Sequence, residues 1–537
     1  ARDRPDAQAP GVARLEGAWT GALEGDHRMV VLSGDPGIGK TTLAAELALR
    51  VHAGSATVLY GRWDEEGLAP YQAIREALGT YAAACPRRML RADVAAHADE
   101  LARLLPDIGA RIGGVRPPLA DDPDAERLRL FDAVRDWLGA IARRRPVLLV
   151  LDDLQWAERS SLLLLRHLLD SPPAGQILTV VTLRDGEVEG MGPLHPLGSF
   201  EGSADVDRID VPGLAAEDVA ALVAQALGRP VGNGAEAEAA RWLVDETAGN
   251  PLFVLEILRG LDPDDPAEAL VQARRRLPER VHDVVRWRLA GLSDDTNATL
   301  AAASFVGEEF SLDVLSSALG SRVLDLRHQL DDAVRAGVVR DADHGHRLAF
   351  AHAVVRRALQ DDVAPDRAAD LHRRIATALA DDPGEGAAAE VAYHYLHAAD
   401  ASTAALAIRW GRAAADHARR ETAFESAVWF LGRVVEVHDR FGDQAADPVR
   451  TRELACELRL DLAEAHDRAG EFIARDRRHL EAADLARDLD RTDLFTRAAL
   501  GYGGRLPAAP PPNSTARRLL GESLARLAAV DGRARAL

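Results

Sequence analysis

Lysine is almost missing from this chain. Lysine and arginine together account for 65 of the 537 residues, and only one of them, Lys40, is a lysine, so the remaining 64 are arginines. Arginine serves wherever a positive charge lies on a surface or faces a carboxylate as a planar fork. The one lysine that the composition keeps therefore indicates a position where a compact charge is required.

Cysteines and aromatic residues are also scarce. The two cysteines, Cys85 and Cys456, are far apart and have no metal-binding spacing, so we expect free thiols in a reducing cytoplasm. None of the 17 histidines belongs to an H-x-x-x-H pair with a supporting acid, and no zinc site is predicted. Aromatic residues make up 5% of the chain while alanine, leucine and arginine run throughout, which favours a helix-rich fold.

Long apolar runs are missing as well. No run approaches the roughly 20 residues that a membrane-spanning helix needs, and the polar opening ARDRPDAQAP is no signal peptide, so we predict no membrane segment. The formal net charge of -20 argues against binding of nucleic acid through the charge of the whole chain. Because the chain lacks an initiator methionine and ends within a helical pattern, we expect it to be part of a longer protein.

Short apolar runs alternate with helical patterns in the first part of the chain. Runs that predict strands begin at Met29, Thr57, Pro146, Ile177 and, more weakly, Arg208. Such an alternation predicts a parallel sheet with helices on both faces, which binds ligands at the carboxyl ends of its strands. Beyond Leu214 the pattern is largely helical, apart from a hairpin-like patch at Gly337–Phe350. A chain of this length has room for several domains.

The single lysine lies in a glycine-rich loop between a predicted strand and a predicted helix. Residues 34–41, GDPGIGKT, fit the pattern G-x-x-x-x-G-K-[ST]. The glycines of this pattern let backbone N–H groups converge on an anion, and the following helix adds the positive end of its dipole. The residues predicted to bind the phosphates of ATP or ADP are Gly34, Gly37, Ile38, Gly39, Lys40, Thr41 and Thr42. A chance glycine loop is the alternative, but the placement of the only lysine in the pattern favours nucleotide binding.

Lys40 and Thr41 have separate roles in such a loop. The ammonium group of Lys40 reaches the β- and γ-phosphates, and the hydroxyl of Thr41 binds Mg²⁺. The apolar run LLVLDD then supplies two acids at the end of a strand. We expect Asp152 to hold the Mg²⁺ shell and Asp153 to polarise an attacking water. Aspartates are also common in ordinary strand-end turns, which is the alternative explanation.

Arg184 ends the predicted strand ILTVVTLR, residues 177–184. From the carboxyl end of a strand an arginine can reach a γ-phosphate and report on its presence, so we count Arg184 with Lys40 and Asp153 among the candidate catalytic residues. In a chain with so many arginines, a surface ion pair is the alternative.

Five stretches in a fixed order carry a resemblance to a known class. They are LSGDPGIGKTTLAAELA, VLLVLDDLQWAERSSLLLLRHLL, ETAGNPLFVLEILR, LPERVHDVVRWRLAGLS and LAFAHAVVRRAL. Together they resemble the STAND class of signalling P-loop ATPases, and more narrowly the ATPase module of the large LuxR-type transcriptional regulators of actinobacteria. The resemblance covers most of residues 29–360 and is less specific beyond them.

The resemblance implies four domains after a lead of residues 1–28. In order they are an α/β P-loop nucleotide-binding domain with an AAA+-like parallel sheet (29–212), a small all-α helical domain (213–276), a winged-helix domain (277–360) and a TPR-like helical-repeat sensor (361–537). It further implies that ADP holds the module closed, and that ATP together with an inducer opens it and permits homo-oligomerisation.

The resemblance also carries individual roles to this sequence. Gly249-Asn250-Pro251 matches the motif whose proline packs near the adenine, which places Asn250 and Pro251 among the cofactor-binding residues. His352 matches the histidine that touches the β-phosphate of ADP, although its alanine neighbours differ from the plant-type motif and a helix-capping or surface histidine is the alternative. The Gly-Arg-x-x-Glu motif that usually precedes the first strand is not found, so the adenine contacts on that side are not predicted.

The function implied is a nucleotide-operated signalling switch with slow ATP hydrolysis. Transcription would be regulated through a C-terminal DNA-binding domain that is not in this chain, and an unidentified inducer or protein partner would act at the helical repeats in the cytoplasm. The alternatives are the same module joined to a nucleotidyl cyclase or kinase, or a scaffold that binds nucleotide without hydrolysis. A transporter motor or remodelling ring has less support, because the LSGGQ signature is absent and no arginine finger is identifiable.

Overall fold

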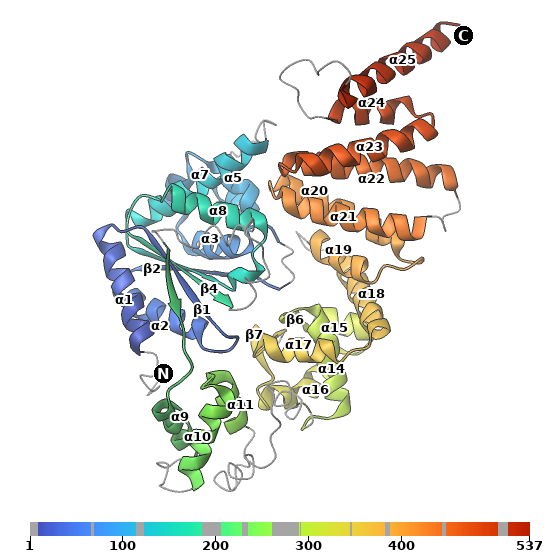
Figure 1. Ribbon diagram of the computed structural model, residues 1–537. Helices are drawn as coiled ribbons and strands as arrows, with labels where there is room; N and C mark the ends of the chain where they lie inside the picture. The colour runs from blue at the N-terminus through green and yellow to red at the C-terminus, as the bar shows by residue number, and fades with distance from the viewer. Residues whose placement is uncertain are drawn as a thin grey trace. The chain divides into compact units, whose positions relative to one another are not determined.

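The computed structural model describes most of the chain (Figure 1). The described residues are 9–65, 69–113, 123–184, 206–227, 235–259, 289, 291–343, 346–381, 387–442, 447–502 and 514–536. Most of the stretch LPERVHDVVRWRLAGLS lies outside them. The chain divides into two compact units, of which the first comprises residues 1–67, 71–118 and 129–364 and the second residues 68–70, 119–128 and 365–537.

A parallel sheet of five strands organises the first unit, in the order β2-β3-β4-β1-β5. Its strands are β1 (Arg28–Gly34), β2 (Thr57–Arg62), β3 (Val147–Asp152), β4 (Ile177–Arg184) and β5 (Val206–Asp210). All five predicted strands are confirmed. The sequence Val-Leu-Leu-Val-Leu of β3 is buried at every position, because helices cover both faces of the sheet.

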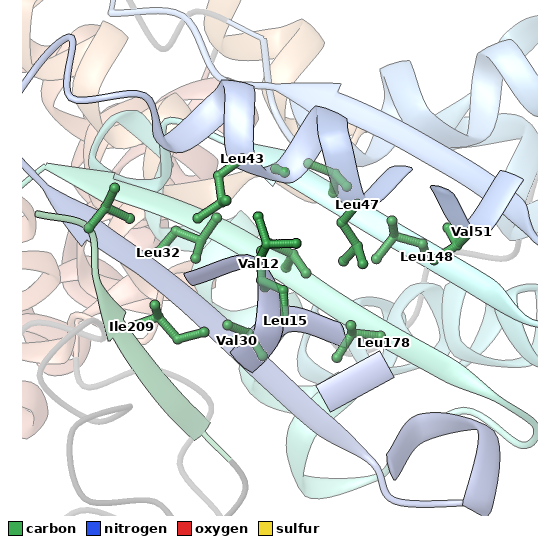
Figure 2. Packing of buried hydrophobic residues seen from close by; sticks show 14 of the residues in the cluster. Val12, Leu15, Val30, Leu32, Leu43, Leu47, Val51, Leu148, Leu178 and Ile209 are labelled. Carbon is green, nitrogen blue, oxygen red and sulfur yellow. The ribbon is translucent and has the colours of Figure 1, made fainter. Parts of the chain in front are cut away.

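One face of the sheet is covered by α1 (Ala9–Glu24) and α2 (Lys40–Ala53), as Figure 2 shows. Leu15 of α1 and Leu43 of α2 pack there against the alternate strand residues that point to this side. The labelled members of this core are Val12, Leu15, Val30, Leu32, Leu43, Leu47, Val51, Leu148, Leu178 and Ile209. The core fixes the start of α2 at the end of β1, which is where the glycine-rich loop lies.

Further helices complete this part of the first unit (Figure 1). On the opposite face of the sheet, Leu138 of α7 and Leu165 of α8 line a small cavity together with Met29 and Ile177. The elements are α3 (Gln72–Ala84), α4 (Arg87–Val94), α5 (Ala98–Leu104), α6 (Pro106–Ile112), α7 (Pro123–Ala142), the short 3-10 helix η1 (Leu154–Trp156) and α8 (Arg159–Asp170).

Two smaller groups of elements follow the sheet within the first unit. The three-helix group consists of α9 (Ala216–Leu227), α10 (Ala235–Thr247) and α11 (Pro251–Arg259), which share a core that includes Val219, Leu243 and Val254. The small-sheet domain consists of α14 (Asp294–Val306), β6 (Glu309–Ser311), α15 (Leu312–Leu319), α16 (Val323–Arg335), β7 (Val339–Asp343), β8 (Arg347–Phe350) and α17 (Ala353–Asp361). Its sheet is antiparallel in the order β6-β8-β7, which confirms the hairpin predicted at Gly337–Phe350.

From Pro365 onward, helices follow one another in the described residues of the second unit. They are α18 (Pro365–Asp381), α19 (Ala388–His397), α20 (Ala404–Arg420), α21 (Phe424–Phe441), α22 (Pro448–Arg468), α23 (Phe472–Asp488), α24 (Thr492–Gly501) and α25 (Thr515–Ala536). Each packs against the next, as expected for stacked helix pairs. Gly411 of α20 allows a close approach, since a Cβ atom there would lie 2.3 Å from Val434 of α21.

None of the helices in the described ranges is long and apolar enough to cross a membrane.

Candidate functional site

The glycine-rich loop adopts backbone angles that glycine alone takes readily. Gly34, Gly37 and Gly39 have φ angles of +150°, +80° and +108°. A Cβ atom on Gly37 would lie only 2.5 Å from a methyl carbon of Leu252, at the start of α11. The loop is therefore shaped both by its own glycines and by the three-helix group that packs against it.

Lys40 is folded into this loop. Its Nζ atom donates hydrogen bonds to the carbonyl oxygens of Gly34 and Asp35, at 2.7 and 2.9 Å, and only 7% of the residue is exposed. Lys40 is also the first residue of α2, which begins at a glycine without a capping side chain. The ammonium group and the positive end of the helix dipole thus lie at the same place, an arrangement that favours an anion.

Asp152 is the buried acid at the end of β3, with 3% of its surface exposed. The hydroxyl of Thr41 donates to both of its carboxylate oxygens at 3.0 Å, the hydroxyl of Thr182 donates at 2.5 Å, and that of Tyr60 donates at 3.2 Å. Burial, and to a smaller extent the charge of Asp153, raises the pKa of Asp152 above its usual value, while the three hydroxyl donors act in the opposite direction.

A divalent cation fits this pair of side chains. Thr41 and Asp152 come from α2 and β3 and already share a hydrogen bond, so an ion that binds both oxygens would replace that contact. A cation would also relieve the cost of keeping a carboxylate ionised at a buried position. The residues present are therefore those expected of a Mg²⁺ shell built around a bound nucleotide.

Asp153 follows directly, in a left-handed backbone conformation with φ of +61°. Its N–H donates to Thr182 Oγ1 at 2.8 Å, and its Oδ1 accepts a hydrogen bond of 2.7 Å from Gln155. Arg184 Nη2 lies 3.5 Å from the same Oδ1 atom, and the Arg184 guanidinium carbon lies 5.6 Å from the ring centroid of Trp156. Aspartate and asparagine are among the few non-glycine residues that adopt this conformation readily, because their short side chains form local hydrogen bonds.

The structure brings the predicted acids and Arg184 together and adds partners that the sequence had not indicated. The side chain of Arg184 is 13% exposed and forms an ion pair with Asp153, so it does not lie on the open surface, and its contact with a γ-phosphate stays a prediction. Gln155 was missed, although it lies in the LDDLQW run; it contacts Asp153 and accepts a 3.3 Å hydrogen bond from the Arg184 N–H.

Asn250 is bound to the glycine-rich loop. Its Nδ2 donates to the carbonyl oxygen of Pro36 at 2.9 Å, and its Oδ1 accepts from the N–H of Leu252 at 3.1 Å. The residue is 3% exposed. Asn250 therefore joins the loop to the start of α11, whereas the contact of Pro251 with adenine stays a prediction.

Replacing Asn250 with alanine should weaken nucleotide binding about 10-fold, because a buried carbonyl loses its donor and the loop loses its support. Asn250→Asp keeps the acceptor for Leu252 but cannot donate to Pro36, and should weaken binding similarly. Titration with a fluorescent ADP analogue measures the effect. Asn297→Ala is the matched control, since Asn297 makes a comparable 2.8 Å bond to the carbonyl of Leu289 in another part of the unit. If Asn250→Asp binds nucleotide with full affinity, the bond to Pro36 does not matter for binding, and Asn250 serves only to cap the start of α11.

His352 precedes α17 in the small-sheet domain and is half-buried. His352 is the N-cap residue of α17, and within the described residues its side chain makes no capping hydrogen bond to that helix. Its contact with a β-phosphate stays a prediction.

The fold and the loop together define a parallel-sheet P-loop domain of the AAA type, followed by a largely helical region. Residues 9–181 match the AAA ATPase domain family. No curated protein matches the chain.

Several solved structures resemble parts of the chain. A STAND protein with a tetratricopeptide repeat sensor from Pyrococcus horikoshii is 13% identical with a TM-score of 0.47, over 90% of this chain and 66% of that one. This chain thus spans slightly less than two thirds of that protein. A Walker-type ATPase of Pyrococcus abyssi is 14% identical with a TM-score of 0.31, over 67% of this chain and 96% of that one. RuvB from Thermotoga maritima is 13% identical with a TM-score of 0.28, over 64% and 92% of the two chains.

Proposed function

We propose that this chain is the nucleotide-operated switch of a STAND-type signalling protein, which binds ADP and ATP and hydrolyses ATP slowly. One observation carries the proposal: the only lysine lies folded into a glycine-rich loop beside the joined Thr41 and Asp152 side chains. A compact positive charge, a helix N-terminus and a buried carboxylate–hydroxyl pair are what a nucleotide triphosphate with its cation requires.

The side chains of the site divide the work of hydrolysis. Lys40 would exchange its two carbonyl partners for the β- and γ-phosphate oxygens, and Thr41 and Asp152 would hold Mg²⁺, which would neutralise phosphate charge. Asp153 accepts a hydrogen bond from the attacking water and aligns it. Arg184 lies 3.5 Å from Asp153, which supports a role for it as the residue that turns toward the γ-phosphate. Gln155 holds Asp153 in its position.

The remaining domains supply the switch and its input. We assign the small-sheet domain as a winged-helix domain, because its order of helix, strand, two helices and two strands is the order of that fold. His352 is its candidate contact to the β-phosphate of ADP. The stacked helices from α18 onward are the candidate sensor for an inducer or protein partner, and assembly of several copies would follow ATP binding.

The output is proposed to be transcription, through a DNA-binding domain outside this chain, in line with the resemblance to LuxR-type regulators. A nucleotidyl cyclase or kinase output would use the same switch. A scaffold that binds nucleotide without hydrolysis is the second candidate, and the pair of acids Asp152 and Asp153 favours hydrolysis over it.

The nucleotide carried by the purified chain tests the proposal. We expect denaturation of the protein to release ADP in an amount that approaches one per chain, because a closed switch holds its diphosphate tightly. The released nucleotide is identified by anion-exchange chromatography, with a mock purification as control. A chain that carries no nucleotide and binds neither ADP nor ATP in the presence of Mg²⁺ would overturn the proposed function.

A further inference from the structure

Arg62 is the last residue of β2 and lies beside Asp152 in the strand register. Its guanidinium faces Glu308, which lies between α14 and β6 in the small-sheet domain. Nη1 donates to Glu308 Oε1 at 3.0 Å, and Nη2 donates to Oε2. Both side chains are about three quarters buried, with exposures of 25% and 22%. Two parallel bonds between a guanidinium and a carboxylate are among the stronger polar contacts in proteins.

A second contact lies three residues further along the chain. The carboxylate of Glu65 is 3.8 Å from Arg356 and 3.9 Å from Arg357, both on α17. Arg356 is 4% exposed and is fixed by a 2.8 Å hydrogen bond from its Nε to the carbonyl of Ser304. The end of β2 and the segment that follows it therefore touch the small-sheet domain at two separate places.

The charge of Asp153 reaches this ion pair. Burial lowers the pKa of Arg62, but the charges of Glu308, Asp64 and Asp153 outweigh it and the net pKa is raised. The pKa of Glu308 is raised, mainly by burial. The charge of Arg62 lowers this pKa, whereas the charge of Asp153 raises it further. Arg62 thus pairs with a carboxylate of the small-sheet domain while it lies, in the strand register, beside Asp152 of the proposed hydrolytic site.

A third phosphate would change this balance. The γ-phosphate of ATP brings further negative charge to the carboxyl end of the sheet, next to Asp152 and Asp153, and ADP does not. An arginine fork binds phosphate as well as carboxylate. When its guanidinium turns to phosphate, Glu308 keeps a buried negative charge without its partner, which is unfavourable.

We propose that Arg62 and Glu308 form a nucleotide-sensing latch, in which the γ-phosphate competes with Glu308 for the Arg62 guanidinium. The latch rests on the proposed function and adds to it the two residues, Arg62 and Glu308, that hold the small-sheet domain while ADP is bound and release it when ATP binds. Glu65 with Arg356 and Arg357 supports the closed arrangement but does not sense the nucleotide.

Distances between spin labels test the latch in the full chain. Leu49→Cys on α2 and Leu324→Cys on α16 offer exposed positions, with 73% and 62% of the residue accessible, whereas the two native cysteines are buried. We expect a narrow distance distribution with ADP and a broad one with Mg²⁺ and a non-hydrolysable ATP analogue. Glu308→Gln should give the broad distribution with ADP as well. Glu309→Gln is the matched control, because Glu309 pairs with Arg347 inside the small-sheet domain at 2.8 Å.

The exchanged pair, Arg62→Glu with Glu308→Arg, separates the latch from a general effect on folding. The exchange restores an ion pair, so the distance distribution with ADP should again be narrow. Because a glutamate at position 62 cannot bind phosphate, the ATP analogue should no longer broaden that distribution. Two results would overturn the latch. One is a distance distribution that the ATP analogue still broadens in the exchanged pair, and the other is a distribution that stays narrow in Glu308→Gln with ADP. If the wild-type chain binds no nucleotide, the proposed function fails. The ion pair can still be tested without nucleotide: if the label distances in Glu308→Gln are distributed as narrowly as in the nucleotide-free wild type, the pair does not hold the small-sheet domain.

Discussion

Replacing Lys40 with alanine is expected to lower the affinity for ADP and ATP by at least about 100-fold, since each charge-assisted hydrogen bond to phosphate contributes roughly 1.5–3 kcal/mol and tenfold in affinity corresponds to about 1.4 kcal/mol. No other lysine exists in the chain to take its place. The measurement is titration with a fluorescent ADP analogue, accompanied by a thermal unfolding curve. The fold should survive, because the bonds of Lys40 run to two carbonyls of its own loop.

Lys40→Arg separates charge from shape. The guanidinium keeps the positive charge but is larger and planar, and the 7% exposure of Lys40 leaves little room for it. We therefore expect this variant also to lose affinity, by about 10-fold or more, at an unchanged net charge. Wild-type affinity in Lys40→Ala would show that the phosphates bind elsewhere. Wild-type affinity in Lys40→Arg would show that the loop does not require a compact charge.

Buried parallel strands were the part of the fold that the sequence predicted best. β4 spans residues 177–184, the limits predicted from the run ILTVVTLR, because most positions of a strand covered on both faces are buried. The glycine-rich loop was predicted equally well, because its backbone angles require glycines and its phosphate site requires a compact positive charge. The small-sheet domain was harder to define from local patterns, and its hairpin was the part that stood out.

The partners of the site residues were not predictable in the same way. Tyr60 reaches Asp152 only because β2 lies next to β3, an order that depends on the whole sheet. Asn250 was expected to lie near the nucleotide, but its hydrogen bond to Pro36 could not be predicted, because the two residues are 214 positions apart in the sequence. Arg62 carries no local signal at all among 64 arginines, and its pairing with Glu308 follows from tertiary packing.

Asp153→Asn is expected to slow ATP hydrolysis at least about 100-fold while changing nucleotide affinity by less than about 3-fold, because removal of a water-orienting carboxylate acts on the transition state more than on binding. Asparagine is the suitable replacement at φ of +61°, since it tolerates the left-handed conformation and its oxygen can still accept from Gln155. Single-turnover release of phosphate measures the rate, and titration measures the affinity. Asp170→Asn, at an exposed acid that ends α8, is the control.

The same variant distinguishes a switch from a scaffold. A switch that is reset by hydrolysis should keep ATP longer when Asp153 is neutralised, and the larger species formed with ATP should persist in light scattering after the wild type has returned to single chains. A scaffold that never hydrolyses ATP has nothing to lose at this position, so variant and wild type would hold ATP for equal times. Normal hydrolysis by Asp153→Asn would move the water-orienting role elsewhere, with Gln155 the next residue to test because it already contacts Asp153 and the N–H of Arg184.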